Sequence, residues 1–522
     1  MTEPDLKSLE ETRKKRRRML FLAGSFLLPV LWLSVLRIVT LSGGENSLDC
    51  FYHIRIAEQG PGTFLAREFP ALQLSVWRDA FADKEWLYHF GLWCLSGIRK
   101  IFGWRAEAPF HFEAVVSICL MCAAFVFAAR RSGVRARTLF AGSLLFVMLT
   151  VNSLARLEML RPHVLSLTLL LIAFGLLAKG SLKFRAWALF GISFLYAWSY
   201  SSPHFIVLAA MVWTALNWKT DSRRGLLLPA AAAAGVFLAL LIHPQTPNTL
   251  LIWKVQSLDA LSSPLTYGAD TNRIPSELMS PDGRDFVTAI PLFLIVFLNL
   301  ILIVRTLEFR GRAGLSAAGA AAAVFGLIFA GAFFWAKRST EYAVPFSVLG
   351  FLVLADDAAR NGVPLPGVRD WKKSAWVLLA VSVLTSGVSS YLFYVRVHGR
   401  EFKPLPELER YLASEFKPGY ALMNPDWSDF PRLYYTAPQL RWLWGLDPSF
   451  SMAADPRKTK LLTMAVPAER IYGETGLRFA VLLYPRRVHA RHLAACGWRL
   501  VRDIPGEAWI FRVPETRGKS RP

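Results

Sequence analysis

Two short segments near the beginning of the chain carry acidic and imidazole side chains at helical spacing. In the first, which runs from Asp49 to Arg55, Asp49 and His53 are four residues apart and share one face if the segment is helical. The second segment supplies three further groups of these kinds: Asp83, Glu85 and His89. Such groups can act as a general base and can ligate a metal ion through oxygen or nitrogen. The alternative interpretation is an ordinary polar loop in which Asp49 caps a helix.

Basic side chains gather in two later clusters. The first contains Arg156, Arg161 and His163, and the second contains Lys337 and Arg338. The planar guanidinium group suits phosphate oxygens, and ionisable groups at membrane depth usually have partners and often functions. An internal Arg–Glu pair is the competing explanation for Arg156. The early acids and the later bases together suit a lipid phosphate held by cations beside a hydroxyl group that a carboxylate activates.

The elements that must position these groups are apolar helices. Hydrophobic residues make up 54% of the 522-residue chain, which is above the roughly 45–50% of soluble domains. Runs of roughly 18 or more apolar residues are typical of membrane-spanning helices. Twelve runs are candidates for spans: 19–41, 86–103, 108–130, 138–155, 162–179, 184–200, 203–217, 225–242, 286–305, 315–335, 341–355 and 374–395.

The run 86–103 decides the topology. If it crosses the membrane, the basic loops that follow it face outward, against the tendency of Lys and Arg to stay in the cytoplasm. If it does not cross, these loops, with Arg130, Lys183 and Arg223 among them, face the cytoplasm. The run also mixes Trp, His and Arg with Leu, which is typical of a helix lying in the membrane interface. We therefore predict a mainly α, polytopic membrane bundle of about eleven spans, with the N-terminus inside and the C-terminus outside.

The chain is predicted to have three parts: a basic cytoplasmic N-terminus (1–18), a transmembrane module (19–395) whose first outer loop is 42–107, and a small extracytoplasmic α/β domain (396–522). In the last part, Pro406–Glu415 has a helical pattern. Three runs there, separated by Pro and Gly, have the pattern of strands: 479–483, 498–501 and 509–513.

The net charge of +22 does not indicate nucleic-acid binding, because the basic residues lie mainly between apolar runs, where they orient helices and contact anionic lipid. Five Cys, an odd number without framework spacing, argue against a disulfide scaffold. The chain has no Asn-x-Ser/Thr sequence, which favours a bacterial inner membrane.

The pattern resembles the GT-C superfamily of polytopic membrane glycosyltransferases. Asp49 stands where that family places a catalytic or metal-binding acid, soon after the first span. Residues 83–89, Asp-Lys-Glu-Trp-Leu-Tyr-His, are similar to a His-Glu-Trp-Leu type of segment in a bacterial subgroup, and residues 161–163, Arg-Pro-His, resemble its Arg-Pro signature. Residues 424–427 and 445–448 are similar to the extracytoplasmic domain of the same subgroup.

The resemblance implies transfer of a sugar from a polyprenyl-phosphate-linked donor to an acceptor at the outer membrane face. Its implied catalytic residues are Asp49, Asp83 and Glu85. The other polar residues singled out above would bind substrate: His53, Arg55, His89, Arg156, Arg161, His163, Lys337 and Arg338. Some members use a divalent ion, Mg²⁺ or Mn²⁺, and the ligands here would be Asp49, Glu85 and His89. Cys50, rather than a second acid, follows Asp49.

Two other classes of function remain open at this point. A transporter or flippase of a lipid-linked or anionic substrate predicts polar groups spread through the spans and, often, repeated halves; here the polar groups gather on one side. A non-catalytic membrane assembly protein accounts for the C-terminal domain, but it gives no reason for Arg residues at the outer ends of spans.

Overall fold

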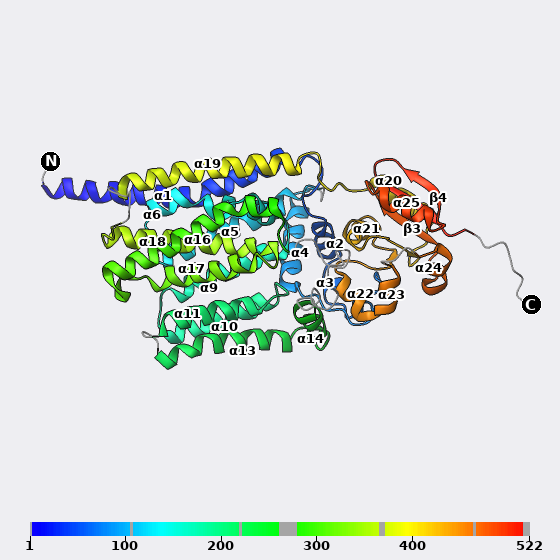
Figure 1. The fold of residues 1–522 in the computed structure, drawn as a ribbon, viewed down its shortest axis with the longest axis horizontal. Helices are drawn as coiled ribbons and strands as arrows, with labels where there is room; N and C mark the ends of the chain where they lie inside the picture. The colour runs from blue at the N-terminus through cyan, green and yellow to red at the C-terminus, as the bar shows by residue number, and fades with distance from the viewer. Residues whose placement is uncertain are drawn as a thin grey trace, which may run out of the picture. The chain divides into compact units, whose positions relative to one another are not determined.

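The structure is a computed structural model that describes residues 3–104, 108–218, 222–259, 279–364, 371–462 and 466–514. The chain forms two compact units, each assembled from three stretches of sequence. Unit 1 contains residues 1–46, 109–239 and 277–401, and unit 2 contains residues 47–108, 240–276 and 402–522. Figure 1 follows the chain through its helices and strands.

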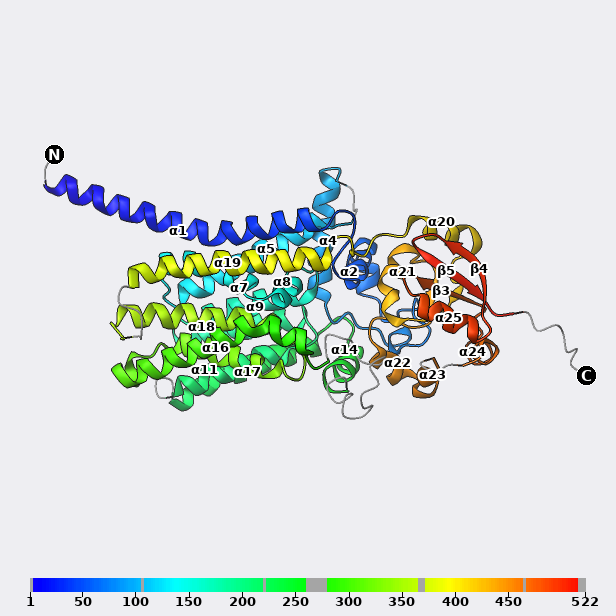
Figure 2. The same cartoon turned by 45° about the horizontal axis from the view of Figure 1, so that its top comes forward.

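Unit 1 is built from apolar helices. In the described part of the chain, six helices are long and apolar enough to span a membrane, and they lie in α1 (Glu3–Thr40), α5 (His111–Arg131), α13 (Leu227–Leu241), α16 (Gly283–Arg310), α18 (Thr340–Arg360) and α19 (Trp371–Val397). Figures 1 and 2 both show α16 and α18 running side by side. The prediction of a mainly helical, multi-pass membrane protein is therefore confirmed.

Shorter apolar helices occupy other predicted runs. They are α9 (Pro162–Leu177), α10 (Leu182–Ala197), α11 (His204–Leu216) and α17 (Ala317–Ala332). Three of these, α9, α11 and α17, fall below the length of a full span and are apolar along their length. The total of eleven spans and the orientation remain predictions.

The predicted run 138–155 is not one straight helix. It is divided into α6 (Ala136–Gly142), α7 (Leu145–Met148) and α8 (Val151–Leu157), and the path bends by 84° before α8. We attribute the bend to Thr150. Its backbone is extended, and its hydroxyl accepts a hydrogen bond from the Ser153 N–H at 3.1 Å. A Thr cap of this kind starts a new helix in a new direction.

Helix α18 packs closely against α17. At Gly326 and Gly350, an added Cβ atom would lie only 2.6 Å from the Ser347 nitrogen and 2.7 Å from the Ala323 nitrogen, respectively. Small residues allow the backbones of membrane helices to approach in this way. The close contact fixes α18, whose first turn carries Glu341.

Unit 2 joins the predicted first outer loop to the C-terminal part of the chain. Helix α2 (Asp49–Gln59) packs against α21 (Phe430–Thr436). The backbone N–H groups of Gln73 and Leu74 donate to the carbonyls of Trp442, in β2 (Arg441–Trp442), and of Leu443, at 2.9 and 2.7 Å. Side chains from both stretches form one hydrophobic core, in which Tyr52 lies against Tyr434.

The other helices of unit 2 are short. They are α3 (Pro61–Phe64), α4 (Trp86–Ile101), α14 (Asn248–Trp253), α22 (Pro448–Ala454), α23 (Pro456–Leu462), α24 (Ala468–Thr475) and α25 (Arg487–Ala495). Helix α4 corresponds to the run 86–103, and it is not among the helices of the described chain that are apolar enough to span a membrane. That 86–103 does not cross the membrane remains a prediction.

The elements predicted for the C-terminal part are present. Helix α20 covers Pro406–Glu415, and a three-stranded antiparallel sheet has the order β3-β5-β4. Its strands are β3 (Phe479–Leu483), β4 (Arg499–Ile504) and β5 (Ala508–Arg512). A second, two-stranded parallel sheet pairs β1 (Ala421–Leu422) with β2 (Arg441–Trp442).

Candidate active site

The first polar cluster lies in unit 2, where the N-terminal end of α4 meets α2. Asp83 is held at three points: its N–H donates to Gln245 Oε1 at 2.7 Å, its Oδ1 accepts from the Glu85 N–H at 3.1 Å, and its Oδ2 lies 2.7 Å from His89 Nδ1. Asp83 and His89 are 1% and 0% exposed. A carboxylate in this position fixes both the tautomer and the orientation of the imidazole ring.

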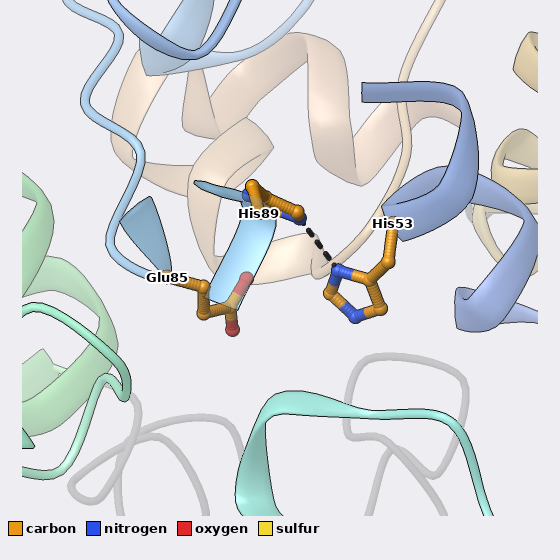
Figure 3. A group of neighbouring side chains, drawn as sticks. All are labelled: His53, Glu85 and His89. Atoms are coloured by element: carbon orange, nitrogen blue, oxygen red, sulfur yellow. Dashed lines mark hydrogen bonds between the residues drawn. The ribbon is translucent and has the colours of Figure 1, made fainter. Parts of the chain in front are cut away.

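His53 on α2 continues this chain of hydrogen bonds. Its Nδ1 lies 2.9 Å from His89 Nε2 (Figure 3). When His89 carries its proton on Nδ1, toward Asp83, its Nε2 presents a lone pair to which His53 Nδ1 can donate. One carboxylate and two imidazoles are thus connected inside a buried cluster.

Glu85 lies beside the two rings. Its side chain is buried, with Lys84 Nζ 3.6 Å from Oε1, and it precedes α4 as the N-cap residue. The negative charges of this cluster affect the pKa of Tyr52, which is buried. Burial raises the pKa of the Tyr52 hydroxyl well above its ordinary value, and the charges of Asp83 and Glu85 raise it further.

Within the described residues, one group of three side chains could hold a metal ion: His53, Glu85 and His89. Their potential ligand atoms all lie within 4.8 Å of one another, and all three side chains are buried. Two imidazoles and one carboxylate form a donor set that transition ions use, so these residues fit a divalent metal. The metal ligands predicted from the sequence were Asp49, Glu85 and His89. In the structure, the group that contains Glu85 and His89 includes His53 instead of Asp49.

The two remaining predicted residues of α2 have other surroundings. Asp49 is the first residue of α2 and is half-buried, one helical turn before His53. The Arg55 guanidinium donates to the Tyr435 carbonyl, lies 4.6 Å above the centre of the Tyr435 ring and pairs with Glu58 at 3.5 Å. Arg55 therefore helps to hold α2 on α21.

The second polar cluster lies in unit 1, where α8 and α18 meet. Arg156 Nε and Nη2 donate to Glu341 Oε2 at 3.0 and 2.8 Å. His163 Nε2 lies 2.8 Å from the Arg156 carbonyl oxygen and 3.8 Å from the same Glu341 oxygen. The internal Arg–Glu pair that was one explanation for Arg156 does form, but with a residue 185 positions away.

Two further cations complete this cluster. Arg338 Nη2 lies 3.5 Å from Glu341 Oε1 and donates to the Tyr200 hydroxyl. Lys337 Nζ lies 3.3 Å from Asp285 Oδ2. Three cations therefore face two carboxylates, and the Arg338 and Lys337 side chains remain 24% and 31% exposed. We call Arg156, Arg338, Lys337, Glu341 and Asp285 the cationic cluster.

Arg161 and His163 are adjacent to the cationic cluster in sequence. Arg161 is the N-cap residue of α9 and is partly exposed, and His163 is buried in the first turn of that helix. The structure thus brings His163 to Arg156 and Glu341.

Several functional candidates were missed in the sequence. Asp285 could have been recognised from a capping box, because Asp282 and Asp285 cap α16 reciprocally. Arg37 could have been noticed as a charged residue within the first apolar run. It is fully buried, donates to both the carbonyl and Oε2 of Glu158 at 3.0 and 3.1 Å, and pairs with Glu45.

No protein-family model matches this chain, and no curated protein matches it in sequence. Solved structures do match. The archaeal oligosaccharyltransferase AglB from Archaeoglobus fulgidus, in complex with an inhibitory peptide and a dolichol-phosphate, is 12% identical with a TM-score of 0.59, over 96% of this chain and 75% of AglB. A structure of the oligosaccharyltransferase from this organism also contains Zn and sulfate.

Two bacterial structures give similar values. ArnT from Cupriavidus metallidurans in the apo state is 15% identical with a TM-score of 0.53, over 96% of this chain and 98% of ArnT, and a second structure holds undecaprenyl phosphate. The arabinofuranosyltransferase AftD from Mycobacteria is 16% identical with a TM-score of 0.55, over 94% of this chain but 40% of AftD. The chain therefore has the fold of GT-C membrane glycosyltransferases, and the predicted resemblance is confirmed at the level of fold.

Proposed function

We propose that this protein is a membrane glycosyltransferase that moves a sugar from a polyprenyl-phosphate-linked donor to an acceptor at the outer face of the membrane. The observation that carries this proposal is the partly exposed cationic cluster, in a chain whose fold is that of enzymes solved with dolichol-phosphate and undecaprenyl phosphate. Guanidinium and ammonium groups that are partly exposed are suited to the phosphate oxygens of such lipids.

In the proposed reaction, an acceptor hydroxyl oxygen attacks the anomeric carbon of the donor sugar. A new C–O bond forms, and the bond from that carbon to the phosphate oxygen breaks, with its electron pair going to the phosphate. Asp49 takes the hydroxyl proton as general base, and Asp83 and Glu85 support it. The leaving charge is stabilised by the basic residues, which are Arg156, Arg161, His163, Lys337 and Arg338.

The proposal includes a topology and a location. Eleven spans with the N-terminus inside place both the first outer loop and the C-terminal part (396–522) outside the cytoplasm, which is where lipid-linked sugar donors would be used. The location that we propose is a bacterial inner membrane with the active site facing the periplasm. Residues 1–18, which are rich in Lys and Arg, remain on the cytoplasmic side.

The test separates binding from turnover. The full chain is purified in detergent, and binding of undecaprenyl phosphate is measured by native mass spectrometry. Turnover is measured as release of undecaprenyl phosphate from a panel of its sugar-linked forms, with a cell-envelope extract as the source of acceptor. We expect wild-type protein to bind and turn over, Asp49→Asn to bind without turnover, and Arg338→Ala to bind at least tenfold more weakly, because charge-assisted hydrogen bonds contribute about 1.5–3 kcal/mol.

The matched control is Arg305→Ala. Arg305 lies near the other end of α16 from Asp285 and pairs with Glu308 on the surface at 2.9 Å. Its loss should leave binding and turnover as in the wild type. If wild-type protein binds no undecaprenyl phosphate, or if Arg338→Ala binds as well as wild type, the proposal fails. Binding with no turnover of any donor would instead favour a flippase or an assembly protein.

A further inference from the structure

The cluster of imidazoles and carboxylates in unit 2 has a chemistry different from that expected of a site for Mg²⁺ or Mn²⁺. Those ions prefer oxygen ligands from carboxylates, carbonyls and water, whereas imidazole suits zinc and related transition ions. Two of the three side chains that come within 4.8 Å of one another are His53 and His89, and only Glu85 offers oxygen. The donor set therefore favours a borderline transition ion.

The atoms that would bind the ion follow from the hydrogen bonds. His89 Nδ1 is 2.7 Å from Asp83 Oδ2, so Nε2 is the His89 atom that points to His53. A histidine that binds a metal usually donates its other ring N–H to a carboxylate, which raises its basicity and fixes its orientation. Asp83 occupies that supporting position, and its own backbone is fixed by Gln245 at 2.7 Å.

Only a small rearrangement separates the present cluster from a metal site. His53 Nδ1 and His89 Nε2 are now 2.9 Å apart, which is a hydrogen-bond distance. Two nitrogen ligands on a tetrahedral zinc ion, each at ~2.0–2.1 Å, would be about 3.3 Å apart. The rings therefore need to separate by a few tenths of an ångström, and the His53 proton has to move from Nδ1 to Nε2 so that Nδ1 presents a lone pair to the ion.

We propose that His53, Glu85 and His89 form a binding site for a divalent transition ion of the zinc type, with Asp83 as a positioning residue that orients His89. Three protein ligands leave a further coordination position for water or a ligand oxygen. This inference stands independently of the proposed transferase activity, because occupancy of the site is measured without any transfer reaction.

The experiment uses the full chain in detergent, first stripped with a chelator. Zn²⁺ is added at limiting concentration in the presence of millimolar Mg²⁺, and bound metal is measured by plasma mass spectrometry. Co²⁺ replaces Zn²⁺ in a parallel sample, where visible absorption reports imidazole ligation. We expect a single tightly held ion, its loss in His53→Ala and His89→Ala, and ~10–100-fold weaker binding in Asp83→Asn, as for other supporting groups.

Two further variants keep the test decisive. Glu85→Gln removes a ligand and leaves the His53–His89 hydrogen bond in place, so it should fold normally and bind Zn²⁺ more weakly. His398→Ala removes an exposed imidazole in unit 1 and should bind as wild type. The proposal is overturned if stripped wild-type protein takes up no ion, if Mg²⁺ displaces it, or if Glu85→Gln and Asp83→Asn both bind as the wild type does.

Discussion

Two arginines of unit 1 form ion pairs with glutamate, and yet their surroundings suit different purposes. Arg37 is fully buried and contacts two carboxylates, those of Glu45 and Glu158. The Arg156 side chain is 11% exposed and shares the carboxylate of Glu341 with a second arginine. At the first site, one cation contacts two carboxylates. In the cationic cluster, three cations face two carboxylates. The ratio of carboxylates to cations, more than burial alone, distinguishes a structural ion pair from an anion-binding site.

Replacing Arg37 should give the largest effect on stability. Arg37→Met leaves Glu45 and Glu158 buried without their cation, and breaking a buried pair by removing one partner typically costs about 3–5 kcal/mol. Thermal unfolding in detergent should show the loss. Adding Glu45→Gln and Glu158→Gln to the same variant should recover most of it, since no buried charge then remains. If the single variant is as stable as wild type, the comparison fails.

Replacing Arg156 should affect ligand binding more than folding. Arg156→Ala removes two charge-assisted hydrogen bonds to Glu341, while Arg338 remains beside that carboxylate. We expect undecaprenyl phosphate to bind about ten- to a hundredfold more weakly, which corresponds to about 1.5–3 kcal/mol. The expected fall in stability is smaller than for Arg37→Met. Equal losses of stability in both variants would mean that both sites are structural.

Neutralising the carboxylates should separate the two sites. Glu341→Gln removes the negative charge that competes with an anionic ligand for Arg156 and Arg338, so undecaprenyl phosphate should bind about two- to fivefold more tightly, as for a partly exposed ion pair of about 0.5–1 kcal/mol. Glu158→Gln, in contrast, should leave binding unchanged. Weaker binding in Glu341→Gln would show that Glu341 is needed chiefly to position Arg156.

Salt should produce the smallest difference between the sites. The cationic cluster is partly exposed, so raising ionic strength from 0.1 to 1 M, which shortens the screening length from about 10 to about 3 Å, should weaken binding of undecaprenyl phosphate. The contribution of Arg37 to thermal stability should hardly change, because its partners are all buried. Isothermal binding and unfolding measurements at the two salt concentrations check both expectations.

Local patterns in the sequence were sufficient for the strongest predictions. Apolar runs of span length predicted α5, α16 and α19, and period-two patterns predicted β3, β4 and β5. The spacing of Glu85 and His89 correctly indicated neighbouring side chains that could share an ion. Charge asymmetry predicted that 86–103 is not a span, and the structure assigns α4 to unit 2 without testing that prediction. Apart from the charge asymmetry, which compares loops along the chain, each of these signals is contained in fewer than thirty consecutive residues.

Other features depend on contacts between distant parts of the chain. The pairing of Arg156 with Glu341 spans 185 positions, and that of Arg37 with Glu158 spans 121. Glu158 stands two residues after Arg156 in the sequence, but Arg156 pairs with Glu341 and Glu158 pairs with Arg37. The break before α8 was also missed, because Thr150 lies within an otherwise apolar run and acts as a cap only once the chain has turned.

The sequence by itself determined that this is a helical membrane protein with acidic, imidazole and guanidinium groups concentrated near the ends of its spans. Those properties follow from composition and periodicity, because whether a segment lies in water or in lipid depends mainly on its own residues. Only the tertiary structure decided that His53, rather than Asp49, joins Glu85 and His89, and that residues from the predicted first outer loop share a hydrophobic core with the C-terminal part. Which groups meet is set by packing across the whole chain, because a side chain gains a partner only where two backbones are brought within a few ångströms.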